Sequence, residues 1–201
     1  MIENFHAEFP QAPKILRSEY GVYGWWGLRP QAHRGDHGRL HGSYPVQYVK
    51  RIMSLFPTAK DVLHVPSGSL NGNLLGDGHI TMDMKQDDVR KPMVVGNACQ
   101  HIPFEDESFD LVMSDPPYTP EDSAEYGCPP WRPMSFFREA NRVLRPGGYL
   151  VYLHQRMPQL LRRDQVNWKF EGVIFITLGS NKLVRVVCFY QKVSPKQARL
   201  F

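Results

Sequence analysis

The stretch that decides the fold is residues 109–118, FDLVMSDPPY. Residues 109–113 form a short, largely apolar run, which is typical of a buried parallel strand. The strand runs directly into Asp115-Pro116-Pro117-Tyr118, where two prolines fix φ and remove two backbone donors. In open α/β sheets, ligands bind beyond the carboxyl ends of the strands. The tetrapeptide therefore predicts a rigid, acceptor-rich loop at a ligand site.

Similar short apolar runs, each bounded by Gly, Pro or Asp, recur along the chain. A helix is expected at 135–144, where apolar residues have helical spacing and RPGG follows as a stop signal. Two β-rich runs, 170–178 and 183–191, are joined by GSNK and indicate a hairpin. The remaining expected strands are 61–65, 79–83, 93–96 and 149–153. This alternation predicts an α/β fold with a mainly parallel sheet, helices on both faces and a C-terminal antiparallel hairpin.

The N-terminal region has a different composition. Glycines are scattered among aromatic residues and histidines, so we expect a loop-rich extension at 1–44. An amphipathic helix is expected from about 45 to 56. No linker divides the 201 residues, which predicts a single domain, 1–201, with a catalytic core at 45–193.

Composition narrows the class of protein. The three cysteines, Cys99, Cys128 and Cys188, are odd in number and widely spaced, so neither a disulfide framework nor a zinc ribbon is expected. No apolar run approaches the roughly 20 residues that cross a bilayer, and the start MIENFHAEFPQAPK has no features of a leader. We therefore expect a cytoplasmic protein with no membrane partner.

Charge is distributed unevenly. Residues 1–60 carry 8 Lys or Arg against 4 Asp or Glu, residues 61–130 carry 3 against 13, and residues 131–201 carry 13 against 3. Basic flanks around an acidic centre suit a protein that holds a polyanion outside and a smaller, cationic or hydroxyl-rich ligand inside. An unevenly charged solvated surface explains the same counts equally well.

The tetrapeptide matches the needs of a planar amine. The exocyclic nitrogen of adenine is a poor nucleophile because its lone pair is delocalised into the ring. If the Asp115 carboxylate and nearby carbonyls accept both N–H groups, the nitrogen is oriented toward an electrophile. Tyr118 supplies a ring on which a base can stack, worth about 1–3 kcal/mol per base. The simpler alternative is a rigid turn with Tyr118 packed beneath it.

The chain resembles the class I S-adenosylmethionine-dependent methyltransferases, and among them the amino-methyltransferases with a (D/N/S)-P-P-(Y/F/W) tetrapeptide. Residues 63–69, LHVPSGS, are similar to the family's first strand and cofactor loop, and FREANRVLRPGGYLVYL at 137–153 is typical of the helix and fifth strand of this superfamily. The resemblance implies a Rossmann-like fold with a seven-stranded sheet. Its implied catalytic residues are Asp115, Pro116, Pro117 and Tyr118. Its implied cofactor residues are His64, Pro66, Ser67, Gly68, Ser69, Asp83, Met84, Asn97, Ala98 and Asp115.

The resemblance also implies a function: methyl transfer from S-adenosylmethionine to N6 of a flipped adenine in DNA, with no metal. RNA or a protein glutamine is the alternative substrate, because the tetrapeptide serves other planar amines, and no large recognition insertion is present. The resemblance does not decide whether a partner protein supplies target recognition or whether two copies of the chain form a dimer. His64 and Leu70 depart from the family's acidic residue and glycine, which keeps a binding-only fold as another alternative. About a dozen residues separate the loop from Asp83, so the first helix must be short or absent.

Other candidates have two interpretations each. Trp25 and Trp26 either stack on unpaired bases or pack in the core. His33, His37 and His41 are four apart, but intervening glycines favour a basic loop over a metal site. The loop 119–133 either closes over a target nucleotide or is a plain connection. A set of arginines is expected to contact phosphate: Arg138, Arg142, Arg145, Arg156, Arg162 and Arg163.

Overall fold

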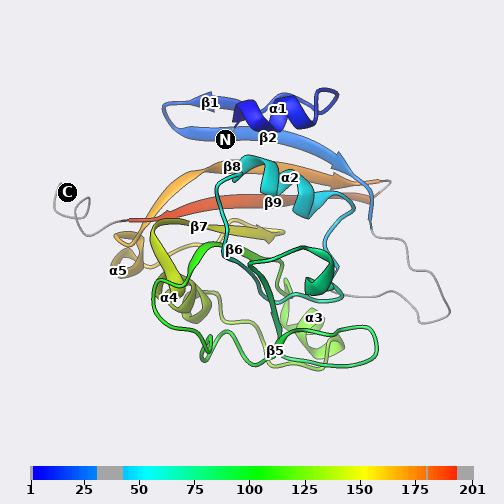
Figure 1. Cartoon of the computed structure of the whole chain (residues 1–201), viewed down its shortest axis with the longest axis vertical. Coiled ribbons are helices and arrows are strands. Elements are labelled where there is room, and N and C mark those ends of the chain that lie inside the picture. Colours follow the sequence, from blue (N-terminus) through cyan, green and yellow to red (C-terminus); the bar gives the residue numbers. More distant parts are fainter. Residues whose placement is uncertain (1, 31–42, 180, 194–201) are drawn as a thin grey trace.

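A computed structural model describes residues 2–30, 43–179 and 181–193. In this part of the chain, nine strands form one sheet with the order β1-β2-β8-β9-β7-β6-β3-β4-β5 (Figure 1). The strands are β1 (Leu16–Ser18), β2 (Gly21–Leu28), β3 (Val62–His64), β4 (His79–Asp83), β5 (Val94–Val95), β6 (Phe109–Ser114), β7 (Leu144–His154), β8 (Trp168–Leu178) and β9 (Asn181–Lys192).

The helices are short. In the sequence, α1 precedes the first strand and the other helices lie between strands. They are α1 (Ile2–Glu8), α2 (Tyr48–Leu55), α3 (Pro120–Glu125), α4 (Pro133–Val143) and α5 (Arg162–Gln165), with a single 3-10 turn, η1 (Gly72–Leu74), between β3 and β4. The 3-10 turn confirms that the first crossover helix is all but absent. The helix expected at 135–144 is α4, and the one expected at 45–56 is α2.

The core of the sheet has the expected topology. Strands β5, β4, β3, β6 and β7 pair in parallel, and β9 inserts antiparallel between β7 and β8. These seven strands are the predicted mainly parallel sheet with its C-terminal hairpin. β6 lies at the centre, so both of its faces are covered: Leu111 packs with α2 residues on one side and Val112 with α4 residues on the other. The expectation of helices on both faces is confirmed.

The prediction that the first 44 residues are mostly loop is wrong. β2 pairs in parallel with β8 along seven residue pairs, and β1 pairs antiparallel with β2, so the sheet has two more strands than expected. Val22, Trp26 and Leu28 point into one core, and the Trp26 ring stacks on Phe5 of α1 at 5.3 Å. The alternation is present in GVYGWWGL, but glycines, which are rare in strands, conceal it. Gly21 is required there because a Cβ would lie 2.6 Å from the Glu171 carbonyl oxygen.

Within the described residues, no helix is long and apolar enough to span a bilayer.

Candidate active site

A cavity of about 730 Å³, open to solvent, lies where the carboxyl ends of β3, β4 and β6 meet. Eight of the predicted site residues line it: Pro66, Gly68, Asp83, Met84, Asn97, Ala98, Asp115 and Pro117. The sheet therefore brings together residues that are up to 51 positions apart, from Pro66 to Pro117, as the strand-end argument predicts.

Asp83 anchors the loop that follows β3. Its Oδ2 accepts a hydrogen bond from the Gly68 backbone N–H at 2.8 Å, and its Oδ1 accepts one from the Lys85 N–H at 3.1 Å. Gly68 has φ of +56°, a left-handed conformation that glycine adopts readily. The Ser67 N–H donates to the Met82 carbonyl at 2.9 Å. The loop is thus held against the end of β4 by main-chain groups and one carboxylate.

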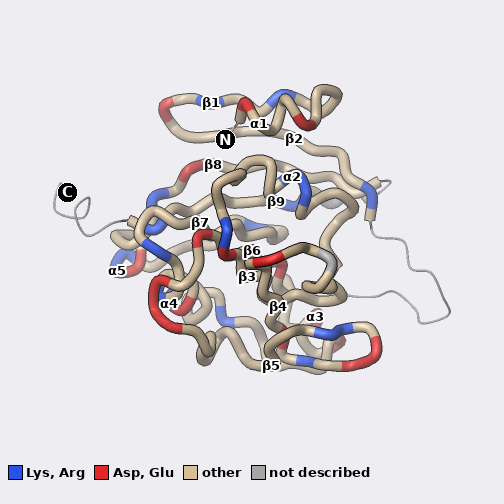
Figure 2. Tube along the Cα trace, in the orientation of Figure 1, with Lys and Arg blue, Asp and Glu red and all other residues tan. Residues whose placement is uncertain are grey.

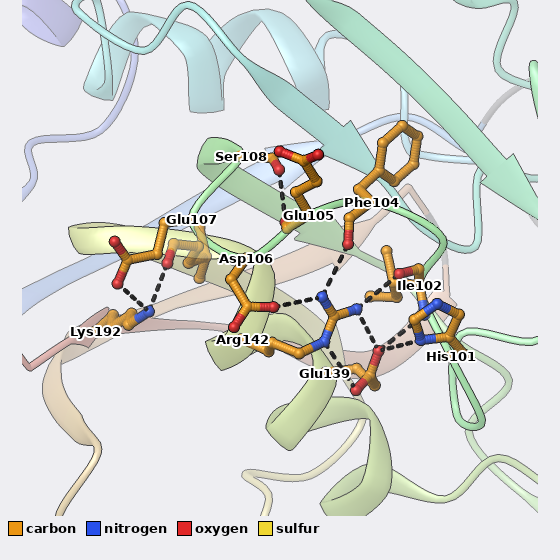
Figure 3. A network of polar contacts seen from close by, with 11 residues as sticks. His101, Ile102, Phe104, Glu105, Asp106, Glu107, Ser108, Glu139, Arg142 and Lys192 are labelled. Atoms are coloured by element: carbon orange, nitrogen blue, oxygen red, sulfur yellow. Dashed lines mark hydrogen bonds and ion pairs between the residues drawn. The ribbon is translucent and has the colours of Figure 1, made fainter.

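The segment after β5 forms the next wall. The Asn97 side chain accepts a hydrogen bond from the Cys99 N–H at 3.0 Å, which fixes a tight turn at the cavity. Figure 3 shows how the following residues are held. Arg142 of α4 donates to the Ile102 carbonyl at 2.7 Å and to the Phe104 carbonyl at 2.8 Å, and it pairs with Glu139 and Asp106. This network fixes the segment behind Asn97 and Ala98.

Asp115 and Pro117 line the third wall, and Asp115 interacts directly with Tyr118, which is not a lining residue. The Tyr118 hydroxyl donates to Asp115 Oδ1 at 2.5 Å. Burial raises the pKa of Asp115 to about 6, against the opposing influence of the Arg185 charge and of the Tyr118 hydrogen bond. Asp115 therefore carries a charge above pH 6 and loses it below. A buried carboxylate of this kind is a strong acceptor for an N–H donor.

The rest of the tetrapeptide is held by α3. Asp122 accepts hydrogen bonds from the Tyr118 N–H at 3.1 Å and the Thr119 N–H at 3.0 Å, and Thr119 caps the helix in return. The Tyr118 ring lies between Arg185, 5.1 Å from its centroid, and the edge of His154 at 4.9 Å. Tyr118 is therefore packed and hydrogen-bonded, as the simpler interpretation expects, and stacking of a base on its ring stays a prediction.

Several predicted site residues do not line the cavity. The Ser67 side chain is buried, the Ser69 hydroxyl bonds Ser43, Pro116 is buried, and Tyr118 packs against Arg185 and His154. His64 points to the opposite core, where its Nε2 lies 3.0 Å from His79 Nδ1. Burial and the neighbouring His79 lower the pKa of His64 to about 3, so the ring is neutral at ordinary pH.

The structure adds residues that the sequence argument missed. Lys85, Arg90, Tyr126 and the run 128–131 line the cavity, so part of the loop 119–133 forms its rim. Tyr44 is buried, and the charges of Asp115 and Asp83 contribute to raising the pKa of its phenol. No sequence signal marks these residues except the length of the loop and the position of Ser43-Tyr44-Pro45 before the helix.

Four buried hydroxyls around the strand ends have no hydrogen-bond partner among the described residues: Tyr44, Tyr48, Ser67 and Ser114. Unpartnered buried hydroxyls are costly, and they are typical of sites that a polar ligand completes. These four residues are not among those that line the cavity, whereas the Asp83 carboxylate and the Asn97 turn are, and the latter suit a ligand that carries hydroxyl groups.

The six arginines expected to contact phosphate divide into two groups. Arg138 pairs with Asp164, Arg142 with Glu139 and Asp106, and Arg145 with Asp61 and Asp110, so these three stabilise the fold. The other three, Arg156, Arg162 and Arg163, are exposed, and Arg163 lies 4.0 Å from Asp164. Figure 2 shows basic and acidic positions beside each other at α5. His33, His37 and His41 lie outside the described residues.

Comparison with known proteins agrees with this geometry. The profile of a methyltransferase-domain family matches residues 79–152. The chain is similar in structure to the PH0226 protein of Pyrococcus horikoshii OT3, with a TM-score of 0.50 and 16% identity over 73% of this chain and 88% of that one. It is also similar to TrmN from Thermus thermophilus, with a TM-score of 0.52 and 18% identity over 77% of this chain and 51% of that one.

A third similar structure is the 1,6-didemethyltoxoflavin-N1-methyltransferase of Burkholderia thailandensis, crystallised with S-adenosylhomocysteine. Its TM-score is 0.50, with 11% identity over 72% of this chain and 76% of that one. No curated protein sequence matches the chain. The chain thus has the fold of these proteins, and its residues 79–152 match the profile of the methyltransferase-domain family.

Proposed function

We propose that the protein transfers a methyl group from S-adenosylmethionine to N6 of an adenine flipped out of DNA. The observation that carries the proposal is one shared cavity. Asp115 and Pro117, from the end of β6, line it together with Gly68 and Asp83 from the ends of β3 and β4. An amine acceptor and a cofactor cradle therefore open into the same space, which methyl transfer requires.

The cofactor half of this cavity has groups suited to each part of S-adenosylmethionine. The Asp83 carboxylate is placed to accept from the ribose hydroxyls, Pro66 and Gly68 of the 66–69 loop line the space for the methionine part, and Asn97 and Ala98 flank the adenine. When bound, the cofactor supplies a methyl group on a sulfonium centre, whose positive charge suits the acidic surroundings.

The target half supplies the orientation. Asp115 accepts one N–H of the target amine, and the Pro116 carbonyl accepts the other, so the nitrogen lone pair is directed at the methyl carbon. The N–C bond forms as the S–C bond breaks, and the amine then loses one proton. Because an amine inside a duplex cannot reach this position, the base must leave the stack. The exposed Arg156, Arg162 and Arg163 are suited to the surrounding phosphates.

The test is transfer of labelled methyl from S-adenosylmethionine to DNA, RNA and protein, assayed separately. We expect transfer to adenine-containing DNA by the wild-type protein. Asp115→Ala should abolish it while cofactor affinity stays within a few-fold, because the lost interaction is made to the reacting amine. Asp77→Ala, which removes an exposed carboxylate outside the cavity lining, is the matched control. Transfer only to RNA or protein, or cofactor binding without any transfer, would replace the DNA proposal.

A further inference from the structure

A row of side chains crosses the sheet from Tyr118 toward its N-terminal edge. Trp25 of β2 pairs with Phe175 of β8, Phe175 with Val186 of β9, and Val186 with His154 of β7. Figure 1 shows these four strands side by side. Directly paired residues point to the same face of a sheet, so the four side chains form one row. With strands about 4.8 Å apart, the row extends about 14 Å.

The inner end of the row reaches the proposed active site. The His154 ring packs edge-on against Tyr118, with ring centroids 4.9 Å apart. It also stacks on Tyr152 at 5.7 Å, which holds the imidazole in place. The row is therefore continuous with the tetrapeptide that we propose to hold the target base.

The outer end of the row is open and aromatic. Trp25 is 48% exposed and Phe175 38% exposed, with centroids 6.5 Å apart, whereas Trp26 is fully buried on the opposite face. The core interpretation is therefore confirmed for Trp26, whereas stacking of bases on Trp25 stays a prediction. Beside Trp25 on the same face lies Gly27, where an added Cβ would meet no described atom within 4 Å. The result is a flat apolar surface with open space above it.

Positive charge lies at both ends of this surface. Arg29 follows the end of β2 and Arg156 follows the end of β7, and both are exposed. Neither forms an ion pair with any residue that the structure describes. The Arg156 backbone N–H donates to His154 Nδ1 at 3.0 Å, which ties this arginine to the row. Aromatic faces with arginines beside them are the usual features of a surface that binds single-stranded nucleic acid.

We propose that Trp25 and Phe175 form a stacking platform for the unpaired DNA bases that neighbour the target adenine. Arg29 and Arg156 then lie near the adjoining phosphates. The inference rests on the proposed function, because it extends a strand whose target base occupies the Asp115 site. Base faces are accessible only in unpaired DNA, so the preferred substrate is a single strand or a locally opened duplex.

The test compares two single-stranded oligonucleotides with one central adenine, one with intact neighbouring bases and one with abasic neighbours. Affinity is measured by fluorescence anisotropy and KM by methyl transfer. We expect the wild-type protein to bind the intact strand about tenfold more tightly, since one stacked base contributes roughly that factor. Trp25→Ala should remove the difference, and Trp25→Phe should restore most of it. Gly27→Leu, which fills the open space without a clash, should also weaken binding of the intact strand.

Tyr20→Ala is the matched control, because Tyr20 is 74% exposed but lies at the turn between β1 and β2, away from the row. Equal responses of wild type and Trp25→Ala to the abasic strand would overturn the platform while leaving methyl transfer intact. Trp25-dependent binding without any methylation would support the platform and refute the proposed function. A Trp25 effect on RNA alone, or on a protein substrate alone, would overturn the DNA assignment.

Discussion

The two halves of the cavity are lined by different kinds of chemical group. In the cofactor half, main-chain N–H groups, a glycine and one hydrogen-bonded carboxylate, Asp83, form the walls. In the target half, Asp115 is buried with a phenol and a guanidinium, and burial raises its pKa to about 6. The first arrangement is satisfied before any ligand binds, whereas the second holds a charge at a cost. The difference indicates that one half is shaped for binding and the other is poised for chemistry.

The largest effect on the binding half is expected from Asp83→Ala. The change removes the acceptor for the ribose hydroxyls and also releases the Gly68 N–H that shapes the loop. We expect cofactor affinity to fall by about 2–4 kcal/mol, measured by calorimetry with S-adenosylhomocysteine. Asp77→Ala should leave it unchanged. An unaltered affinity in Asp83→Ala would show that the cofactor lies elsewhere.

A smaller effect is expected in the target half, where Asp115→Asn should increase the stability of the folded protein. The pKa of Asp115 is raised in the folded state from 3.8 to about 6. The folded protein therefore holds this proton more tightly than the unfolded chain, and stability falls as pH rises from about 4 to 6 and stays lower above. Asparagine does not ionise, so the variant should be more stable than wild type by about 1–3 kcal/mol at pH 8.

Urea unfolding at pH 4, 6 and 8 measures this difference. The advantage of Asp115→Asn should shrink toward pH 4, where the wild-type carboxyl is protonated. An advantage that is the same at every pH, or absent at pH 8, would mean that the Asp115 charge is not costly in the fold.

The smallest effect concerns phosphate contacts outside the cavity. Arg156→Ala should reduce the slope of log affinity against log salt for DNA by about one, since one phosphate contact is lost. Arg138→Ala, which removes an arginine already paired with Asp164 at 3.1 Å, should leave that slope unchanged. Equal slopes for wild type and Arg156→Ala, in binding titrations from low to moderate salt, would exclude Arg156 from the contact surface.

Much of the fold follows from sequence because its signals are local. Strands such as 109–114 are short, largely apolar runs. The hairpin turn, GSNK, and the stop signal after α4, RPGG, each occupy only four consecutive residues. The parallel arrangement then places Gly68, Asp83 and Asp115 at one edge without further information. β2 escaped prediction because three glycines interrupt its apolar alternation, and the need for Gly21 arises only against Glu171 of β8 in the folded sheet.

The site was less predictable where side chains choose their partners in space. The Tyr118 to Asp115 hydrogen bond, the Arg185 contact and the role of Arg142 all join residues whose proximity depends on the folded sheet. His64 follows the same rule, because strand alternation turns it away from the cavity toward His79. A count of arginines likewise could not separate Arg138, Arg142 and Arg145, which pair with acids across the fold, from Arg156 and Arg162, which have no ion pair among the described residues.

The most direct test of the account is to identify the methylated atom. The protein is incubated with labelled S-adenosylmethionine and single-stranded DNA, and the digested nucleosides are analysed by mass spectrometry. The account predicts label in N6-methyladenine for wild type, none for Asp115→Ala, and cofactor binding within a few-fold in both. Label in cytosine, or equal yields of N6-methyladenine from wild type and Asp115→Ala, would contradict the role assigned to the target half of the cavity.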